Sequence, residues 1–161
     1  SKQKFIYELI PTQNYKNIQE SFKEELLKLS KANKIILIYP IPEAGWNVPK
    51  KLFNKLPKKS DEVKKYIKNN LVPKEYITTS YKVYKERTNS SFEVLDSITG
   101  GNIYRVYPHK FLCNNLIKDR CITHDNENIF YRDSHHLSIK GAEKISNLII
   151  KEIDKIQLKS N

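Results

Sequence analysis

One uninterrupted apolar run limits what this chain can fold into. Residues 34–41 read Lys-Ile-Ile-Leu-Ile-Tyr-Pro-Ile, without the polar alternation of a strand that has one face in water. Such a run predicts a strand that is covered on both faces, as in a parallel sheet. Proline cannot donate to a strand ladder, so Pro40-Ile41-Pro42 predicts where the strand ends. An α/β domain is therefore expected.

Helical periodicity flanks this strand on both sides. An amphipathic helix that ends near Ala32-Asn33 is predicted from Ile18, Phe22, Leu26 and Leu29. A polar insertion with Gly45, Trp46 and Pro49 follows the strand. Ser60 is expected to cap a short helix carrying Val63, Ile67 and Leu71. A longer helix is expected from about Thr78 to Leu95, with Tyr81, Tyr84 and Phe92 facing inward.

The second half repeats the pattern of a strand followed by a helix. Gly100-Gly101 breaks the chain, and residues 103–107 predict a second buried strand. A long loop is expected over residues 108–133. The last helix is expected to start near Ser138 and to bury Ala142, Ile145, Ile149 and Ile153. Two clear strands are few for a complete doubly wound sheet.

The length of 161 residues fits one domain, residues 1–161, that can bury a core. No apolar run approaches the roughly 18–20 residues that cross a bilayer. The sequence has neither an initiator methionine nor a signal peptide. We therefore expect the chain to begin within a longer protein or after processing, with any targeting or membrane segment outside it.

The net charge of +11 comes from 29 Lys and Arg against 18 Asp and Glu. A basic surplus favours polyanions or an acidic membrane surface, but dispersed lysines are also found on merely solvated helix faces. The sequence has no dense arginine block and no stacking-aromatic motif, so nucleic acid binding is not expected. The two cysteines, Cys113 and Cys121, have seven residues between them. This spacing suits either a local disulfide in an oxidising compartment or two free thiols.

The segment Tyr131-Arg132-Asp133-Ser134-His135-His136-Leu137-Ser138 carries the candidate chemistry. It lies in a loop after a predicted strand and just before a helix, where sites form in open α/β sheets. A turn across Asp133-x-x-His136 can place the carboxylate on one imidazole nitrogen, leaving the other to take a proton from a hydroxyl nucleophile. Ser138 and Gly141 suit the helix start that anchors this loop. The alternative is a surface aspartate that caps a helix beside two solvated histidines.

A metal site is the weaker interpretation of the same loop. Asp133, His135, His136 and His124 are all possible ligands. Adjacent histidines in an irregular loop are an unusual zinc arrangement, and the cysteine pair lacks zinc-knuckle spacing. We therefore expect neither a metal ion nor another cofactor.

Taken together, these segments resemble a known family. Asp133-x-x-His136-Leu137-Ser138 with Gly141-Ala142 resembles the last block of the SGNH hydrolases. The stretches 39–43 (Tyr-Pro-Ile-Pro-Glu), 45–49 (Gly-Trp-Asn-Val-Pro) and 111–121 are similar to a narrower group, the SGNH domains fused behind multi-pass acyltransferase-three membrane domains. That group O-acetylates cell-surface polysaccharides. The resemblance spans roughly residues 18–149.

The resemblance implies a fold and several residue roles. The fold would be a three-layer, flavodoxin-like parallel sheet flanked by helices, here without its first strands. Asp133 and His136 match the acid and base of a Ser-His-Asp triad, whereas His135 matches a non-catalytic position. The cysteines match a pair expected to form a disulfide outside the cytoplasm. Glu43 and Trp46 become candidates for substrate binding, although Glu43 is about as well explained as a loop anchor.

The chain departs from the family at the nucleophile. None of Gly45, Gly100, Gly101 and Gly141 is followed by Asp-Ser, so an upstream segment is expected to supply the serine and the oxyanion donors. Ser134 and Ser138 share the turn with the base and are better explained as caps.

The resemblance implies acetyl transfer from a fused or associated membrane acyltransferase domain to a glycan acceptor. The domain would be periplasmic and tethered to the inner membrane. Two other functions fit the same residues: an acetylesterase, and a non-catalytic basic module that binds an acidic polysaccharide or nucleic acid.

Overall fold

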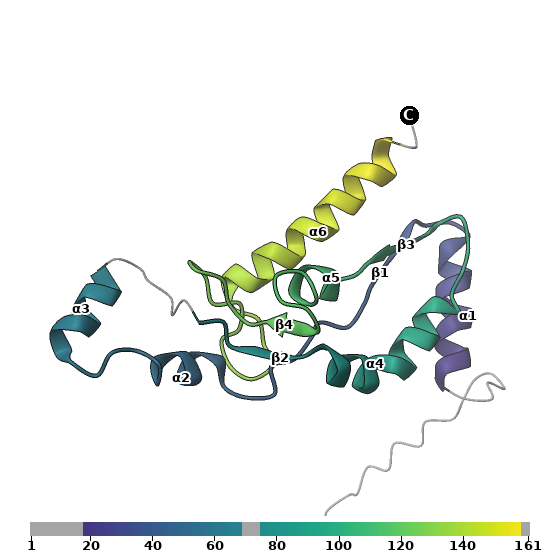
Figure 1. Cartoon of the computed structure of the whole chain (residues 1–161). Helices are drawn as coiled ribbons and strands as arrows, with labels where there is room; N and C mark the ends of the chain where they lie inside the picture. Colours follow the sequence, from purple (N-terminus) through teal and green to yellow (C-terminus); the bar gives the residue numbers. More distant parts are fainter. Residues whose placement is uncertain (1–17, 69–74, 159–161) are drawn as a thin grey trace, which may run out of the picture.

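A computed structural model describes residues 18–68 and 75–158 (Figure 1). Residues 1–17 and the predicted helix residue Leu71 lie outside the described residues. The elements in chain order are α1 Ile18–Ser30, β1 Ile35–Ile38, α2 Val48–Phe53, α3 Ser60–Lys68, β2 Thr78–Ser80, α4 Tyr81–Asp96, β3 Ile103–Val106, α5 His109–Leu112, β4 Arg120–Ile122 and α6 Ile139–Leu158.

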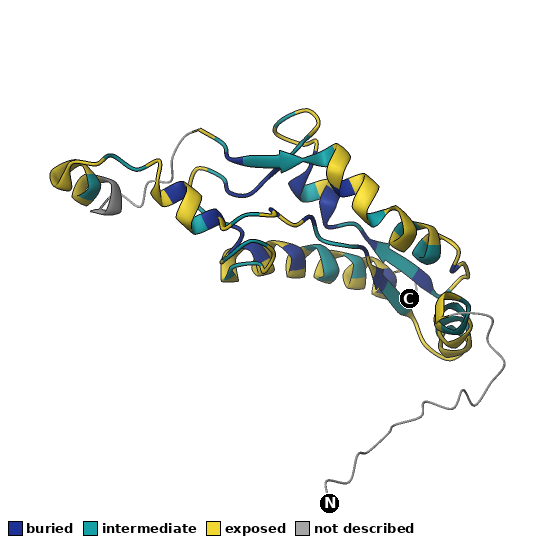
Figure 2. Ribbon diagram, turned by 90° about the horizontal axis from the view of Figure 1, so that it is seen from below, coloured by how far each residue is buried: buried dark blue, intermediate teal, exposed yellow. Residues whose placement is uncertain are grey.

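The two strands predicted from apolar runs pair in parallel, which confirms the α/β class. Ile35 lies opposite Ile103, and Ile38 lies opposite Val106. Leu37 and Tyr39 are buried in a cluster with side chains of α1 and α4. Figure 2 shows the strands between α4 on one side and α6 on the other, the order of a three-layer domain.

Two surfaces that the sequence predicts to be buried, one on β1 and one on α6, are only partly covered by residues 18–68 and 75–158. Both faces of β1 are predicted to be covered, but Ile38 is 47% exposed. On α6, Ile145 is buried as expected, but Ala142 is exposed and Ile153 is 38% exposed. The apolar pattern identifies a face that packing can cover, but it does not supply the segment that covers it. Within the described residues no strand lies next to β1 on its second edge, so no side chain of a neighbouring strand shields Ile38 from that side.

The long helix starts later than predicted, and a second small sheet replaces part of the expected loop. Thr78–Ser80 forms β2, which pairs antiparallel with β4. Ser80 has extended backbone (φ −77°, ψ 124°), and its hydroxyl accepts from the Val83 amide at 3.3 Å. A serine in this conformation ends a strand and caps a helix at once, so α4 begins at Tyr81.

The polar insertion after β1 contains a short helix that the composition did not predict. Asn47 caps α2 by accepting a hydrogen bond from the Lys50 amide at 2.8 Å, and Pro49 occupies the first turn. Val48 and Leu52 are buried, so this segment is part of the core. Of the helices described, none is long and apolar enough to cross a membrane.

Candidate active site

The loop 131–137 is a closed turn held by its own backbone. Tyr131 and Leu137 form an antiparallel bridge. The Arg132 amide donates to the His136 carbonyl at 3.0 Å. These contacts bring the ends of the loop together, so Asp133 and His136 face each other across the turn.

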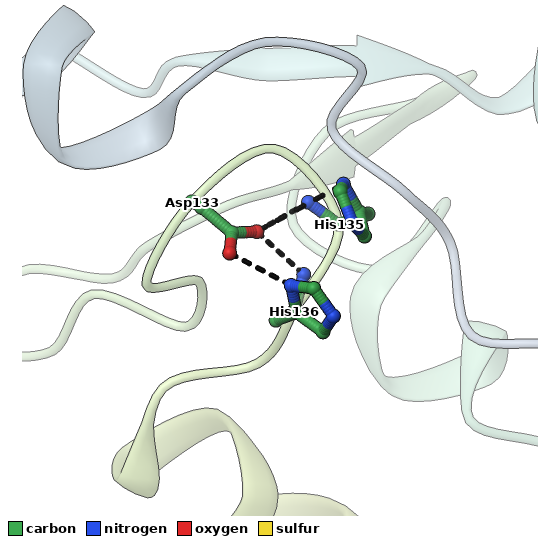
Figure 3. Close-up of side chains that lie close together, drawn as sticks. All are labelled: Asp133, His135 and His136. Carbon is green, nitrogen blue, oxygen red and sulfur yellow. Dashed lines mark hydrogen bonds and ion pairs between the residues drawn. The ribbon is translucent and has the colours of Figure 1, made fainter.

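Asp133 accepts three hydrogen bonds from the residues that follow it (Figure 3). Its Oδ1 accepts from the backbone amides of His135 (2.9 Å) and His136 (2.8 Å). Its Oδ2 lies 2.7 Å from His136 Nδ1. The amide of His135, then that of His136, holds the pKa of Asp133 well below its usual range. The group is therefore a carboxylate at neutral pH.

The charge on Asp133 decides the tautomer of His136. A carboxylate only accepts hydrogen bonds, so Nδ1 of His136 carries the proton that lies between them. In the neutral ring, Nε2 then has a free lone pair. The His136 side chain is 54% exposed, so a hydroxyl group can approach this nitrogen. The pair has the geometry of an orienting acid and a general base.

The loop after β1 is bonded directly to the candidate site. The Gly45 amide donates to the Ser134 carbonyl at 3.0 Å, and the Val48 amide donates to the Asp133 carbonyl at 3.2 Å. The Tyr131 hydroxyl donates to the Pro42 carbonyl. Two motifs about 90 residues apart in the sequence therefore form one structural unit.

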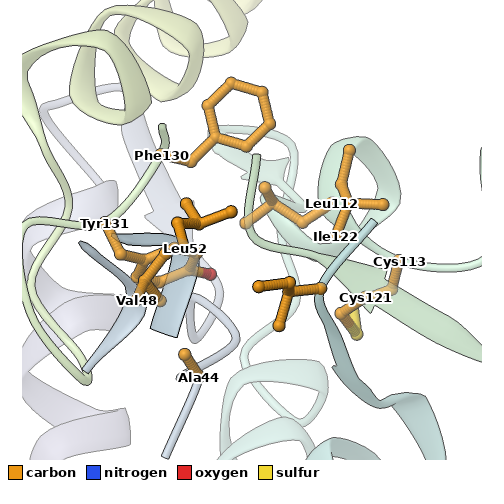
Figure 4. Close-up of a cluster of buried hydrophobic side chains, with 10 residues drawn as sticks. Ala44, Val48, Leu52, Leu112, Cys113, Cys121, Ile122, Phe130 and Tyr131 are labelled. Atoms are coloured by element: carbon orange, nitrogen blue, oxygen red, sulfur yellow. A yellow bond between two sulfur atoms is a disulfide. The ribbon is translucent and has the colours of Figure 1, made fainter. Parts of the chain in front are cut away.

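A buried cluster beneath the site joins these loops to the rest of the domain (Figure 4). It combines Val48 and Leu52 of α2 with Phe130 and Tyr131 of the site loop. Cys113 and Cys121 belong to the same cluster and form a disulfide, which confirms the expected pairing. The bridge therefore cross-links the buried cluster to which residues of both loops belong.

Ser138 and Gly141 anchor the other end of the loop. Ser138 Oγ accepts from the Gly141 amide at 3.1 Å and donates to the Ile129 carbonyl. A Cβ on Gly141 would lie only 2.1 Å from the Phe130 carbonyl oxygen. Only glycine lets α6 approach the backbone at Phe130 this closely. Ser138 is therefore a helix cap, as predicted. Ser134 was also expected to be a cap, but its hydroxyl lies 2.7 Å from His135 Nδ1 instead.

The four potential metal ligands lie at two separate positions in the structure. One ligand atom each from Asp133, His135 and His136 lies within 4.8 Å of the others, a spacing that a divalent ion could use. His124 is separate and fully buried, where its Nε2 accepts from the Ile77 amide at 3.0 Å. The oxygens of Asp133 are already engaged by three donors, which favours the orienting role over metal binding.

The two candidate substrate residues lie in different surroundings. Glu43 forms an ion pair with Arg87 of α4, with Oε2 and Nη2 3.0 Å apart. Trp46 packs against the buried cluster, and Lys51 Nζ lies 4.3 Å from the centre of its ring. Arg87 was not identified from the sequence, because nothing local pairs it with a carboxylate 44 residues away. Substrate binding by either residue stays a prediction.

Comparison with known proteins places the chain in a family. A family model described as "SGNH domain (fused to AT3 domains)" matches residues 3–151, which is nearly the whole chain. No curated protein matches the sequence. No solved structure matches it either.

Proposed function

The chain belongs to the SGNH domains that are fused to AT3 domains, and we propose that it transfers acetyl groups to a cell-surface glycan. His136 is the general base and then the general acid, and Asp133 orients it. The nucleophile is a serine that a segment upstream of residue 1 supplies, together with the oxyanion donors. The acetyl donor reaches the site through the AT3 membrane domain.

The observation that carries this proposal is the contact of 2.7 Å between Asp133 Oδ2 and His136 Nδ1. In the neutral ring this contact makes the second imidazole nitrogen the acceptor, on a side chain that is 54% exposed. The two backbone amides on Oδ1 keep Asp133 ionised, so it can stabilise the imidazolium that forms during turnover. An aspartate that only capped a helix would accept hydrogen bonds from the backbone amides, and it would have no need of a contact with the imidazole.

The reaction then follows two proton-balanced steps. In the first, Nε2 of His136 takes the serine proton while the serine oxygen bonds to the acetyl carbonyl carbon, and the imidazolium returns that proton to the departing donor group. In the second, Nε2 takes the proton of a glycan hydroxyl, whose oxygen attacks the acetyl-serine. The same proton then returns to the serine oxygen. Each step leaves His136 neutral and Asp133 ionised.

The open edge of β1 supports an upstream contribution to the site. Among the strands described, β1 pairs only with β3. The Ile35 and Tyr39 amides donate to β3-side carbonyls, and in a strand successive residues direct these groups to alternate edges. Ile36 and Ile38 therefore offer backbone groups to a further strand. A strand added there would end beside the loop 40–45 that contacts the site.

The disulfide and the family context support an extracytoplasmic location. Structural disulfides persist in oxidising compartments such as the bacterial periplasm. The bridge of Cys113 and Cys121 is buried, and the domain belongs to a family fused to membrane domains. We propose that the domain is tethered at the periplasmic face of the inner membrane.

The test compares two neighbouring histidines in the intact protein. His136→Ala should lower the transfer of acetyl from a small acetyl ester about a thousandfold or more, because the base is lost. His135→Ala is the matched control, since its side chain is similarly exposed (52% against 54%) but does not have the 2.7 Å contact. Equal activities of the two variants would refute the role of His136.

The products separate transfer from hydrolysis. Acetylated glycan formed only with acceptor present supports the transferase, whereas acetate released in water at the same rate supports an esterase that uses the same pair. Binding to an acidic polysaccharide that falls steeply with salt, without any acetyl chemistry in the intact protein, would instead support the non-catalytic module.

A further inference from the structure

A cavity lies beside the candidate site, between the loop after β1 and the start of α4. Its volume is about 330 Å³, at the lower end of the range for small-molecule sites. The loop contributes Pro40, Glu43 and Gly45, and the other wall contains Thr79, Arg87 and Thr88. A volume of this size suits one compact unit of a larger ligand rather than a long chain.

The cavity shares its wall with the Asp133–His136 loop. Gly45 lines the cavity, and its amide donates to the Ser134 carbonyl at 3.0 Å. The segment that carries Glu43 is fixed by two buried phenols: Tyr84 donates to the Pro40 carbonyl at 2.7 Å, and Tyr131 donates to the Pro42 carbonyl. Burial raises the pKa of Tyr84 to about 12, so the phenol stays a donor at neutral pH. One wall of the cavity is therefore hydrogen-bonded to the site loop and held in place by buried phenols.

The polar groups of the cavity suit hydroxyl groups better than anions. Glu43 and Arg87 pair through one oxygen and one nitrogen, so their charges cancel locally. A second carboxylate oxygen and further guanidinium donors remain on the two groups. Both side chains are partly exposed, 47% for Glu43 and 60% for Arg87. The pair offers an acceptor and a donor side by side, which is the pattern presented by two adjacent hydroxyls.

We propose that this cavity binds one neutral sugar unit of the acceptor glycan, with Glu43 accepting from one ring hydroxyl and Arg87 donating to its neighbour. This inference rests on the proposed function and names the subsite that holds the acceptor. Thr79 and Thr88 add hydroxyl oxygens on the wall that carries Arg87, where the Thr88 hydroxyl donates to the Tyr84 carbonyl at 2.8 Å. Trp46 does not line this cavity, and Lys51 lies over its ring, so stacking on that indole is not part of the proposal.

Binding is measured separately from turnover. The probes are the methyl glycosides of glucose, galactose, mannose and rhamnose, followed by saturation-transfer NMR on the intact protein carrying His136→Ala. At least one glycoside should bind, and Glu43→Gln or Arg87→Lys should weaken that binding about tenfold or more, because a hydrogen bond to a charged group is lost. Glu86→Gln is the matched control: Glu86 is an exposed carboxylate on α4, paired with Lys82 and outside the cavity.

Kinetics on the protein with His136 present give the second readout. The same two variants should raise KM for the glycan acceptor by about tenfold, with little change in the acetylation of the enzyme by a small acetyl ester. Unchanged sugar binding and KM in both variants would overturn the inference while leaving the proposed function intact. Tighter binding of methyl glucuronide than of its neutral counterpart would also overturn it, because an anion would then be the preferred ligand.

The two proposals fail in different ways. Loss of sugar binding in the Glu43 and Arg87 variants supports the subsite whatever the His136 variant does to turnover. Turnover that does not depend on His136 would count against the proposed function alone.

Discussion

Gly141→Ala should destabilise the domain, because the first turn of α6 has no room for a side chain. The new Cβ would lie 2.1 Å from the Phe130 carbonyl oxygen, 2.9 Å from its carbon and 3.1 Å from a methyl carbon of Leu137. Backbone atoms cannot rotate away as a flexible side chain can. The helix and the segment at Phe130 must therefore separate by roughly 1 Å to reach ordinary contact.

The cost of that separation follows from the bonds it stretches. The Phe130 carbonyl accepts from the Ser138 amide at 2.9 Å, and the Gly141 amide donates to Ser138 Oγ at 3.1 Å. Overpacking costs about 1–3 kcal/mol, and each weakened hydrogen bond adds about 1 kcal/mol. Alanine recovers about 1 kcal/mol as a better helix former than glycine. The net loss should be about 2–4 kcal/mol.

The assay is thermal and urea unfolding of the chain, followed by circular dichroism. For a domain of this size the loss corresponds to a fall in Tm of about 4–16 °C. Gly101→Ala is the control, since no atom lies within 4 Å of the position that its Cβ would occupy and the backbone there is unstrained. That variant should stay within about 0.5 kcal/mol of wild type. A Gly141→Ala protein as stable as the Gly101→Ala protein would refute the close approach of α6.

Three further predictions concern stability and pH. Replacing both Cys113 and Cys121 with serine should lower the free energy of unfolding in urea by about 2.5 kcal/mol, because the unfolded chain loses the constraint of a short disulfide loop. An unchanged urea midpoint would contradict a stabilising bridge. Burial lowers the pKa of His109, whose Nδ1 is buried without a partner among the described groups. The free energy of unfolding should therefore fall as the pH drops below 6.5. His109→Phe should remove this pH dependence and add about 1 kcal/mol of stability at neutral pH. An identical pH dependence in the variant would contradict the prediction for His109. The pKa of Asp133 is lower in the folded chain than in the unfolded one, so ionised Asp133 stabilises the fold above pH 3.8 and this stabilisation is lost as the pH falls below that value. The stability of Asp133→Asn should therefore depend less steeply on pH in this acid range than that of wild type. Parallel curves would contradict this contribution.

Local sequence patterns determined the elements that depend on neighbours in the chain. The apolar run at residues 35–38 and the run at 103–106 both became strands, because side-chain burial and proline placement act over a few residues. The turn from Asp133 to His136 was equally local: three of its hydrogen bonds join residues two or three positions apart. The helix cap at Ser138 followed from the same short-range logic.

Long-range contacts decided what these patterns could not. The strand at Thr78–Ser80 needs β4, which is about 40 residues away in a segment whose composition indicated only a loop. The ion pair of Glu43 with Arg87 and the bond from Tyr131 to Pro42 have no local signal, since each joins residues far apart in the chain.

By itself the sequence determined the family and the short turn that brings Asp133 to His136, because each depends on residues that lie close together in a motif. Only the tertiary structure decided that the loop after β1 and the loop 131–137 form one unit, joined by backbone hydrogen bonds at Gly45 and Val48. It also decided that Ile38 and Ile153 stay partly exposed. The physical reason is that periodicity tells which face of an element is apolar, whereas only the packing of distant segments determines what covers it.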